Sequence, residues 1–244
     1  RAPLPAGASR ARILVTGVSG QVGHALLSRL RPFGEVITAA EPGHEADVAM
    51  DLGDRAAIVE VIRKVAPTLI VNPAAYTAVD RAEDEPDLAR RINAEAPGVL
   101  AAEAARLGAP LVHYSTDYVY SDSSAAPLDE STPIAPLSVY GRTKAEGDAL
   151  VAELSPKHVV LRTSWVFSER GNNFVRAMLR LGAERSLLRV VGDQFGAPTS
   201  AAFLADMTAR VVERLLVGAD VSGVYHLTCS GVTSWHGFAE EIFR

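Results

Sequence analysis

The chain is poor in several features that mark whole classes of protein. Cys229 is the one cysteine among 244 residues, which excludes an internal disulfide and suits a reducing cytosol. No run of 18 apolar residues occurs, so we expect no membrane span. The net charge of −5 gives no basic surface for nucleic acid. We therefore expect a cytoplasmic protein that holds any anionic ligand through local features.

Short apolar runs alternate with helical patterns along the first two thirds of the chain. The predicted strands are 12–16, 35–39, 69–72, 110–115 and 159–162. The predicted helices are 22–30, 55–65, 86–107 with a break or bend near Pro97, and 140–154. This alternation predicts an α/β fold, a doubly wound parallel sheet of Rossmann type with a smaller C-terminal substrate-binding lobe.

The pattern also suggests domain boundaries. Residues 1–11 read as a disordered leader, 12–162 as an NAD(P)-binding Rossmann domain, and 163–244 as the substrate-binding lobe, partly interleaved with the core. A final helix begins at Trp235 after Ser234 as N-cap, with no stop signal behind it. We expect the natural protein to continue beyond this point.

A glycine-rich loop follows the first predicted strand. Gly17, Gly20 and Gly23 are spaced G-x-x-G-x-x-G and lead into a helix, as in dinucleotide-binding loops. The alternative is a plain tight turn. Ala40 stands where an acidic residue would bind the adenosine ribose, and Glu41 follows it, so NADP and NAD both remain open. Asp51 and Leu52 are predicted to contact the adenine ring.

Tyr140 and Lys144 lie four residues apart on a predicted helix and so share one face. A lysine ammonium beside a tyrosine would lower the pKa of the phenol and make it a better acid–base group. Thr116, at the carboxyl end of a predicted parallel strand, is the expected third member of this catalytic group. The alternative is a solvated helix face that happens to carry Tyr-x-x-x-Lys.

Several strings together resemble the dTDP-4-dehydrorhamnose reductase family of the extended short-chain dehydrogenase/reductase superfamily. They are GQVG at 20–23, NPAAYTAVD at 72–80, STDYVY at 115–120, YGRTK at 140–144, LRTSWV at 161–166, GNNF at 171–174 and DQFGAPT at 193–199. The resemblance spans residues 12–244. Pro73 departs from it, since the family usually has alanine there.

The resemblance implies a role for each matching position. The cofactor pyrophosphate would be held by Gly17, Gly20, Gln21 and Val22. The nicotinamide-ribose side would be lined by Ala74, Ala75 and Tyr76, with Tyr140 and Lys144. The sugar would contact Thr116, Asp117 and Trp165, although Trp165 could equally be a core residue. Some family members dimerise through a magnesium ion held by a glutamate in the first helix; residues 23–26 read GHAL, so we expect no metal.

The implied reaction is reduction of the 4-keto group of dTDP-4-dehydro-6-deoxy-L-mannose to dTDP-L-rhamnose, with NADPH or NADH as donor and Tyr140 as proton donor. The partner would be the dTDP-linked keto-sugar, and the enzyme a monomer or homodimer. Two alternatives stay open. One is an NAD-dependent nucleotide-sugar epimerase or dehydratase using Asp117 as a further acid–base group. The other is a non-catalytic regulatory subunit resembling that of methionine adenosyltransferase.

Three further residues carry expectations that do not depend on ligands. Arg162 is expected to pair with an internal carboxylate, and His113 to be a satisfied interior residue. Cys229 reads as an inert small hydrophobe within an apolar strand.

Overall fold

A single parallel sheet organises the chain. The computed structural model describes residues 11–121 and 127–244. Within them seven strands pair in the order β10-β6-β5-β4-β1-β2-β3, and every pair is parallel. The strands are β1 (Ala11–Val15), β2 (Gly34–Ala40), β3 (Val48–Ala49), β4 (Leu69–Asn72), β5 (Leu111–Thr116), β6 (His158–Thr163) and β10 (Gly223–His226). The order reverses between β1 and β4, as in doubly wound dinucleotide-binding folds, which confirms the predicted fold class.

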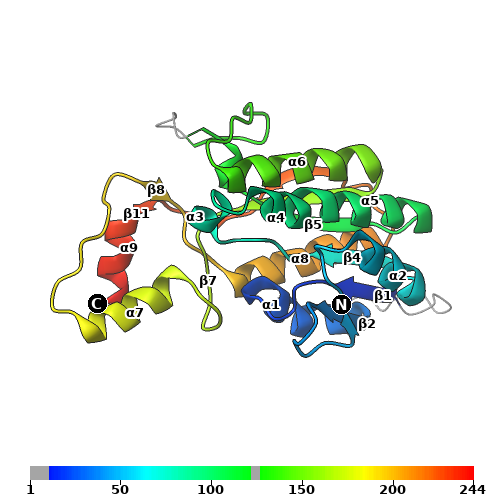
Figure 1. Cartoon of the computed structure of the whole chain (residues 1–244), viewed down its shortest axis with the longest axis horizontal. Helices are drawn as coiled ribbons and strands as arrows, with labels where there is room; N and C mark the ends of the chain where they lie inside the picture. The colour runs from blue at the N-terminus through cyan, green and yellow to red at the C-terminus, as the bar shows by residue number, and fades with distance from the viewer. Residues whose placement is uncertain (1–10, 122–126) are drawn as a thin grey trace.

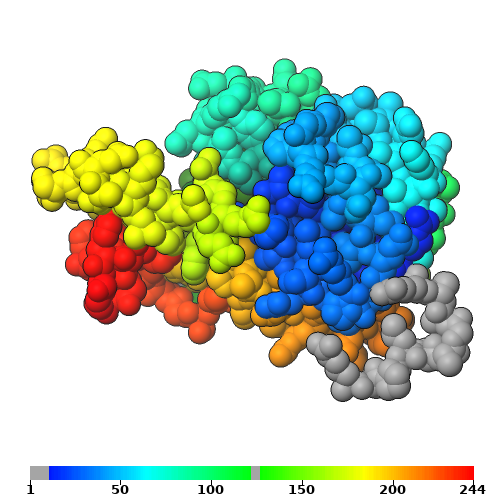
Figure 2. All heavy atoms as spheres, turned by 90° about the horizontal axis from the view of Figure 1, so that it is seen from below, coloured from blue at the N-terminus to red at the C-terminus, as the bar shows by residue number. Residues whose placement is uncertain are grey.

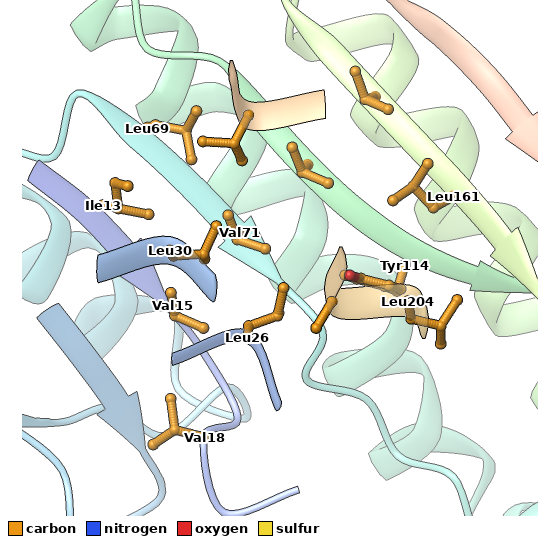
Figure 3. Close-up of a cluster of buried hydrophobic side chains, with 14 of the residues drawn as sticks. Ile13, Val15, Val18, Leu26, Leu30, Leu69, Val71, Tyr114, Leu161 and Leu204 are labelled. Carbon is orange, nitrogen blue, oxygen red and sulfur yellow. The ribbon is translucent and has the colours of Figure 1, made fainter. Parts of the chain in front are cut away.

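Helices cover both faces of this sheet (Figure 1). On one face α1 (Gln21–Leu30) packs beside α8 (Ala201–Leu216). On the other face lie α2 (Arg55–Val65), α5 (Ala96–Leu107) and α6 (Val139–Leu154). Successive residues of β1 point to opposite faces, so Ile13 and Val15 join the core under α1 and α8 while Leu14 joins the core under α2 and α5 (Figure 3).

The predicted long helix over 86–107 is three segments. They are α4 (Pro86–Arg90), a π-helical turn η2 (Arg91–Glu95) and α5. Pro97 is the second residue of α5 and follows this π-helical turn directly, so the irregularity lies near Pro97 as expected. The remaining short helices are η1 (Arg31–Phe33), α3 (Val79–Ala82) and η3 (Asp117–Val119).

The last third of the chain divides between the sheet and a small lobe. Helix α8 and strand β10 return to the sheet, whereas α7 (Phe174–Glu184), α9 (Trp235–Ile242) and the antiparallel pair β8 (Phe195–Gly196) and β11 (Thr233–Ser234) form the lobe that projects at the left of Figure 1 and Figure 2. Strands β7 (Val166–Phe167) and β9 (Thr199–Ser200) pair where the two parts join. Aromatic rings fill the lobe: those of Trp165, Phe167, Phe174, Trp235 and Phe238 contact one another.

Two details differ from the expected pattern. Ala11, which we assigned to the leader, is the first residue of β1, and residues 1–10 lie outside the described ones. Cys229 is not in a strand: β10 ends at His226, which pairs with Arg162 of β6, and the Cys229 backbone N–H donates to the Thr199 hydroxyl at 3.3 Å. Across the two described ranges, no helix is both long enough and apolar enough to cross a bilayer.

Candidate active site

A cavity of about 560 Å³ opens at the carboxyl ends of β1, β2, β4 and β5. This is the edge where doubly wound sheets bind ligands. Eleven residues that the sequence singled out line it: Gly17, Gly20, Gln21, Val22, Gly23, Leu52, Ala74, Ala75, Tyr76, Tyr140 and Lys144. Segments far apart in the sequence thus meet around one space.

The glycine loop is shaped for close backbone approach. Gly17 has a φ of +58°, and a Cβ there would lie 2.8 Å from the Cβ of Ala74. A Cβ on Gly23 would lie 2.2 Å from the Gly17 carbonyl oxygen. Gly20 precedes α1, and no side chain caps the first amides of that helix. The first residues of α1 line the cavity, and their amides are free of side-chain caps. The loop therefore fits the pyrophosphate of a dinucleotide.

The end of β2 forms the other wall of the cavity. Ala39, Ala40 and Glu41 line it, together with Met50 and Leu52. Asp51 does not line it: its side chain is exposed and accepts a hydrogen bond from the Gly53 N–H at 2.7 Å. Asp51 therefore serves the turn before α2, and of the predicted adenine-contacting pair only Leu52 reaches the cavity.

Helix α6 brings Tyr140 and Lys144 to the cavity wall. Ser138 begins the helix by accepting the Gly141 N–H at 3.0 Å. Lys144 is 1% exposed, and its Nζ donates to the Tyr114 carbonyl oxygen at 2.7 Å. Burial lowers the pKa of Lys144 to about 8, against the opposing effect of the Asp148 carboxylate.

The prediction that Lys144 lowers the pKa of the Tyr140 phenol is wrong for this arrangement. Burial raises the pKa of Tyr140 above its ordinary value, and the hydrogen bond with the Thr116 side chain opposes that rise. Lys144 is not among the groups that shift this pKa, and its Nζ donates to the Tyr114 carbonyl oxygen of β5. Tyr140 is accordingly a protonated phenol at neutral pH, suited to donate a proton.

Thr116 and Asp117 follow β5 at the same edge. Thr116 is buried, and its Oγ1 lies 3.1 Å from Asp117 Oδ1, to which it donates. It also accepts the Tyr118 N–H at 3.2 Å and so begins η3. Burial raises the pKa of Asp117 to about 6. The Tyr118 ring packs edge-on against that of Tyr140, with centroids 5.5 Å apart.

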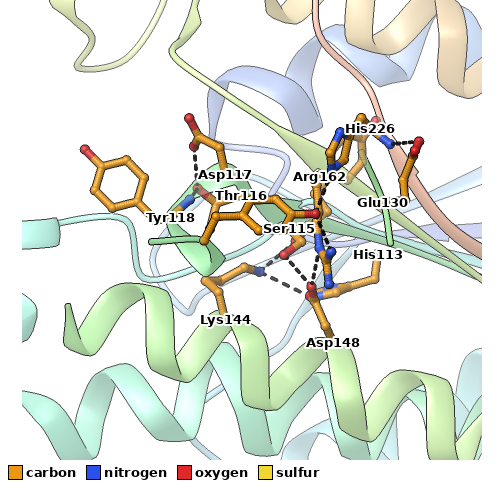
Figure 4. A network of polar contacts seen from close by, with 12 residues as sticks. His113, Ser115, Thr116, Asp117, Tyr118, Glu130, Lys144, Asp148, Arg162 and His226 are labelled. Atoms are coloured by element: carbon orange, nitrogen blue, oxygen red, sulfur yellow. Dashed lines mark hydrogen bonds and ion pairs between the residues drawn. The ribbon is translucent and has the colours of Figure 1, made fainter. Parts of the chain in front are cut away.

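A polar network lies beneath these residues (Figure 4). Arg162 Nε pairs with Asp148 Oδ2 at 3.2 Å, so the expected internal carboxylate partner is present. His113 is fully buried, with Nδ1 3.0 Å from Asn72 Nδ2 and Nε2 3.3 Å from Lys144 Nζ, as expected of a satisfied interior histidine.

Comparison with known proteins decides which family this site belongs to. The family model described as "RmlD substrate binding domain" matches residues 11–244. The dTDP-4-dehydrorhamnose reductase of Escherichia coli K12 is 45% identical over 95% of this chain and 77% of its own length. The chain belongs to the dTDP-4-dehydrorhamnose reductase family. The expected enzyme class, an NAD(P)H-dependent oxidoreductase, is thereby confirmed.

Solved structures of family members agree in fold. A dTDP-4-dehydrorhamnose reductase from Clostridium acetobutylicum superposes with a TM-score of 0.88 at 39% identity, covering 96% of this chain and 79% of that one. The enzyme from Bacillus anthracis, solved in complex with NADP, superposes with a TM-score of 0.86 at 36% identity, covering 98% and 81%.

The residues predicted to contact the sugar are gathered around the cavity less closely than those predicted to bind the cofactor. None of the three lines the cavity. Thr116 and Asp117 lie beside Tyr140, and Trp165, at a φ of +46°, stacks on Trp235 with centroids 3.5 Å apart. Asn172 does line it, and Asn173 donates to Gln21 Oε1 at 2.9 Å. In the described ranges no three metal-ligating side chains gather into a candidate site.

Several cavity residues were not predicted as site residues from the sequence, among them Arg81, Ser115 and Thr163. Arg81 lines the cavity although its stretch reads as a solvated acidic approach to a helix. Thr163 and Ser115 line it from the ends of β6 and β5. Their position at the carboxyl ends of parallel strands was the one available signal.

Proposed function

We propose that this enzyme reduces the 4-keto group of dTDP-4-dehydro-6-deoxy-L-mannose to the alcohol of dTDP-L-rhamnose, with NADPH or NADH as the electron donor. The observation that carries the proposal is the placement of Tyr140 in the wall of a cavity that the glycine loop also lines, with Thr116 beside Tyr140. A carbonyl oxygen placed between these hydroxyls would meet one proton donor and one hydrogen-bonding partner.

The cavity fits the cofactor at both ends. Gly17, Gly20, Gln21 and Val22 would hold the pyrophosphate, and Leu52 would contact the adenine. Ala74, Ala75 and Tyr76 would line the nicotinamide-ribose side with Lys144. A bound NADPH or NADH supplies a hydride to the carbonyl carbon, becoming NADP⁺ or NAD⁺.

The side chains handle the proton and the carbonyl oxygen. Tyr140 donates its phenolic proton to the oxygen as the carbon is reduced, so that ketone, hydride and proton together give the alcohol. Thr116 orients that oxygen. Burial favours the neutral phenol, and the Asp117 and Asp148 carboxylates act on Tyr140 in the same direction. Lys144, fixed at the Tyr114 carbonyl, lies within the same cavity wall.

The sugar would lie between this edge and the small lobe. Asp117 is placed beside Thr116, where its carboxylate can accept a hydrogen bond from a sugar hydroxyl. One face of the Trp165 ring is covered by Trp235, so any contact of Trp165 with the sugar would use the other face or the ring edge. The enzyme would act in the cytoplasm, as a monomer or homodimer, and the single cysteine supports a reducing compartment.

The experiment is a turnover assay with purified protein and the dTDP-4-keto-sugar, first with NADPH and then with NADH. Stoichiometric loss of reduced nicotinamide with formation of dTDP-L-rhamnose is the expected result. Sugar isomerisation without net cofactor loss would favour an epimerase, in which Asp117 serves as a further acid–base group. Tight cofactor binding with no chemistry on the sugar would favour a regulatory subunit.

A further inference from the structure

A chain of hydrogen-bonded side chains runs through the sheet beneath the cavity. The Thr16 hydroxyl donates to Asn72 Oδ1 at 2.6 Å, and Asn72 Nδ2 lies 3.0 Å from His113 Nδ1. His113 Nε2 in turn lies 3.3 Å from Lys144 Nζ. Asn72 and His113 are completely buried, while Thr16 and Lys144, the two ends of the chain, line the cavity.

The reaction proposed above assigns no role to His113. Burial lowers the pKa of His113 well below its ordinary value, and the nearby Lys144 charge acts in the same direction. The ring is therefore neutral. A buried imidazole loses its hydration, a cost that an apolar side chain at the same place in β5 would not carry. Its two ring nitrogens need hydrogen-bond partners, and Lys144 Nζ is the partner of one of them.

Lys144 has few other partners that could fix its direction. An ammonium has three N–H donors, and the Tyr114 carbonyl takes one of them at 2.7 Å. Asp148, one turn further along α6, binds the Ser115 hydroxyl at 2.8 Å and Arg162 Nε at 3.2 Å through Oδ2. Its other oxygen, Oδ1, has no hydrogen-bond partner in the described ranges and lies 3.9 Å from His113 Nε2, so Asp148 acts on the lysine through its charge and not through a hydrogen bond. His113 Nε2, at 3.3 Å, is thus the side-chain atom within hydrogen-bond distance of Lys144 Nζ among the described residues (Figure 4).

We propose that His113 is a positioning residue for the reduction: its neutral ring, oriented by Asn72, holds Lys144 Nζ at the cavity wall beside Tyr140. The inference rests on the proposed reductase function. It assigns to the buried chain from Thr16 to Lys144 a part in catalysis, exerted through the lysine and not by contact with the sugar.

The Asn72 amide lets the chain serve both states of the lysine. With Nδ2 toward the ring, Nδ1 accepts, the ring proton lies on Nε2, and Nε2–H donates to an uncharged amine. With the amide reversed, Nδ1–H donates to Oδ1, the Thr16 hydroxyl accepts from Nδ2 in place of donating to Oδ1, and Nε2 accepts from an ammonium. In both states His113 supplies a bond to Nζ, so the lysine keeps its place.

Two substitutions separate the two ring nitrogens. In His113→Gln the side-chain amide reaches the former position of Nε2 and keeps a hydrogen-bonding partner for Lys144, but it loses the contact with Asn72. In His113→Asn the amide reaches only the position of Nδ1, so it keeps Asn72 and loses Lys144. His158 provides the matched control, because its Nδ1 bonds the Ser155 carbonyl oxygen at 2.7 Å at the other end of β6.

The measurements are kcat and KM with the dTDP-4-keto-sugar and NADPH, together with Tm, for wild type and for H113Q, H113N, H158Q and H158N. We expect H113N to lose about tenfold to a hundredfold in kcat, the size of effect that misplacing a catalytic group produces, with a KM for the sugar close to that of wild type. H113Q should keep clearly more of the wild-type kcat than H113N at a similar or lower Tm. Both His158 variants should keep the wild-type kcat.

The possible failures are distinct. A wild-type protein that does not turn over the keto-sugar overturns the proposed function itself. An active wild type, with H113N at least as active as H113Q, overturns the positioning role and makes the Asn72 contact the important one. If kcat follows Tm across all four variants, His113 is a stability residue only and the inference fails.

Discussion

The Asn173 side-chain amide donates to Gln21 Oε1 at 2.9 Å, and so ties the small lobe to the glycine loop. Gln21 begins α1 and lines the cavity, while Asn173 begins α7 by accepting the Arg176 N–H at 3.1 Å. The Ser168 hydroxyl donates to the same Gln21 oxygen at 2.9 Å. The helix of the lobe is therefore registered against the loop that would hold the cofactor.

This link predicts different outcomes for two substitutions of Asn173. Asn173→Ala removes both the helix cap and the link, and should cost about 1 kcal/mol of stability as well as catalytic efficiency. Asn173→Asp keeps an acceptor for the Arg176 N–H but places a carboxylate against Gln21 Oε1 and against the Ser168 and Arg170 carbonyl oxygens, to which the Asn173 amide also donates. We expect N173D to fall in kcat/KM for the sugar while its Tm stays closer to wild type. A wild-type kcat/KM in N173D would mean that the link does not position the lobe.

Gly17 should be far less replaceable than another glycine of the same backbone conformation. Gly17 and Gly108 have φ values of +58° and +68°, but a Cβ on Gly108 would meet nothing within 4 Å. Gly108→Ala should therefore cost only about 1–2 kcal/mol for the left-handed conformation. Gly17→Ala adds overpacking against Ala74, about 1–3 kcal/mol more.

The check is denaturant unfolding of both variants, with NADPH binding followed by fluorescence. G17A should be the less stable of the two and should bind NADPH more weakly than wild type. G108A should bind it normally. Equal stability and equal binding of the two variants would contradict the close approach of Gly17 to Ala74.

Tyr140→Phe tests the proton donor. Loss of the hydroxyl should lower kcat by about a hundredfold to ten-thousandfold, the usual contribution of a positioned acid, and leave NADPH binding nearly unchanged. Tyr225→Phe is the control, because that hydroxyl bonds the Val221 carbonyl oxygen at 3.0 Å on the edge strand β10. Y140F with wild-type turnover would remove Tyr140 from the mechanism.

Asp117 should make stability depend on pH in a defined window. Its folded-state pKa is about 6, above the ordinary value of 3.8, because it is buried. Between these values the unfolded chain is ionised while the folded protein keeps the proton, so stability falls as pH rises, and the deficit is constant above the folded pKa. Asp117→Asn has no ionisable group at this position, so it lacks this pH-dependent contribution to stability. The difference in unfolding free energy between D117N and wild type, measured by urea titration, should grow in favour of D117N from about pH 4 to pH 6 and then level off; a difference independent of pH would contradict the assigned pKa.

Local patterns in the sequence predict the sheet and the cofactor loop, because both depend on residues close together in the chain. The apolar run at 12–16 and the glycine spacing after it predict β1 and the turn into α1 within one residue. Tyr140 and Lys144 share a helix face by spacing alone.

Tertiary contacts decide what local patterns cannot. The spacing of Tyr140 and Lys144 does not reveal that the Tyr114 carbonyl oxygen on β5 accepts a hydrogen bond from the lysine. Trp165 stacks on Trp235, which lies 70 residues later in the chain, so the local sequence does not predict this contact. Strand β10 ends at His226, opposite Arg162 of β6, and no feature of the sequence around Cys229 indicates that end.

Isotope transfer tests the central claim most directly. The enzyme is given the dTDP-4-keto-sugar and NADPH carrying deuterium at nicotinamide C4, and the product sugar is examined by NMR and mass spectrometry. The account predicts a deuterium on C4 of the sugar, formed with one equivalent of NADP⁺ and abolished by Y140F. A product whose C4 hydrogen comes from water, or an altered sugar formed without NADP⁺, would contradict it.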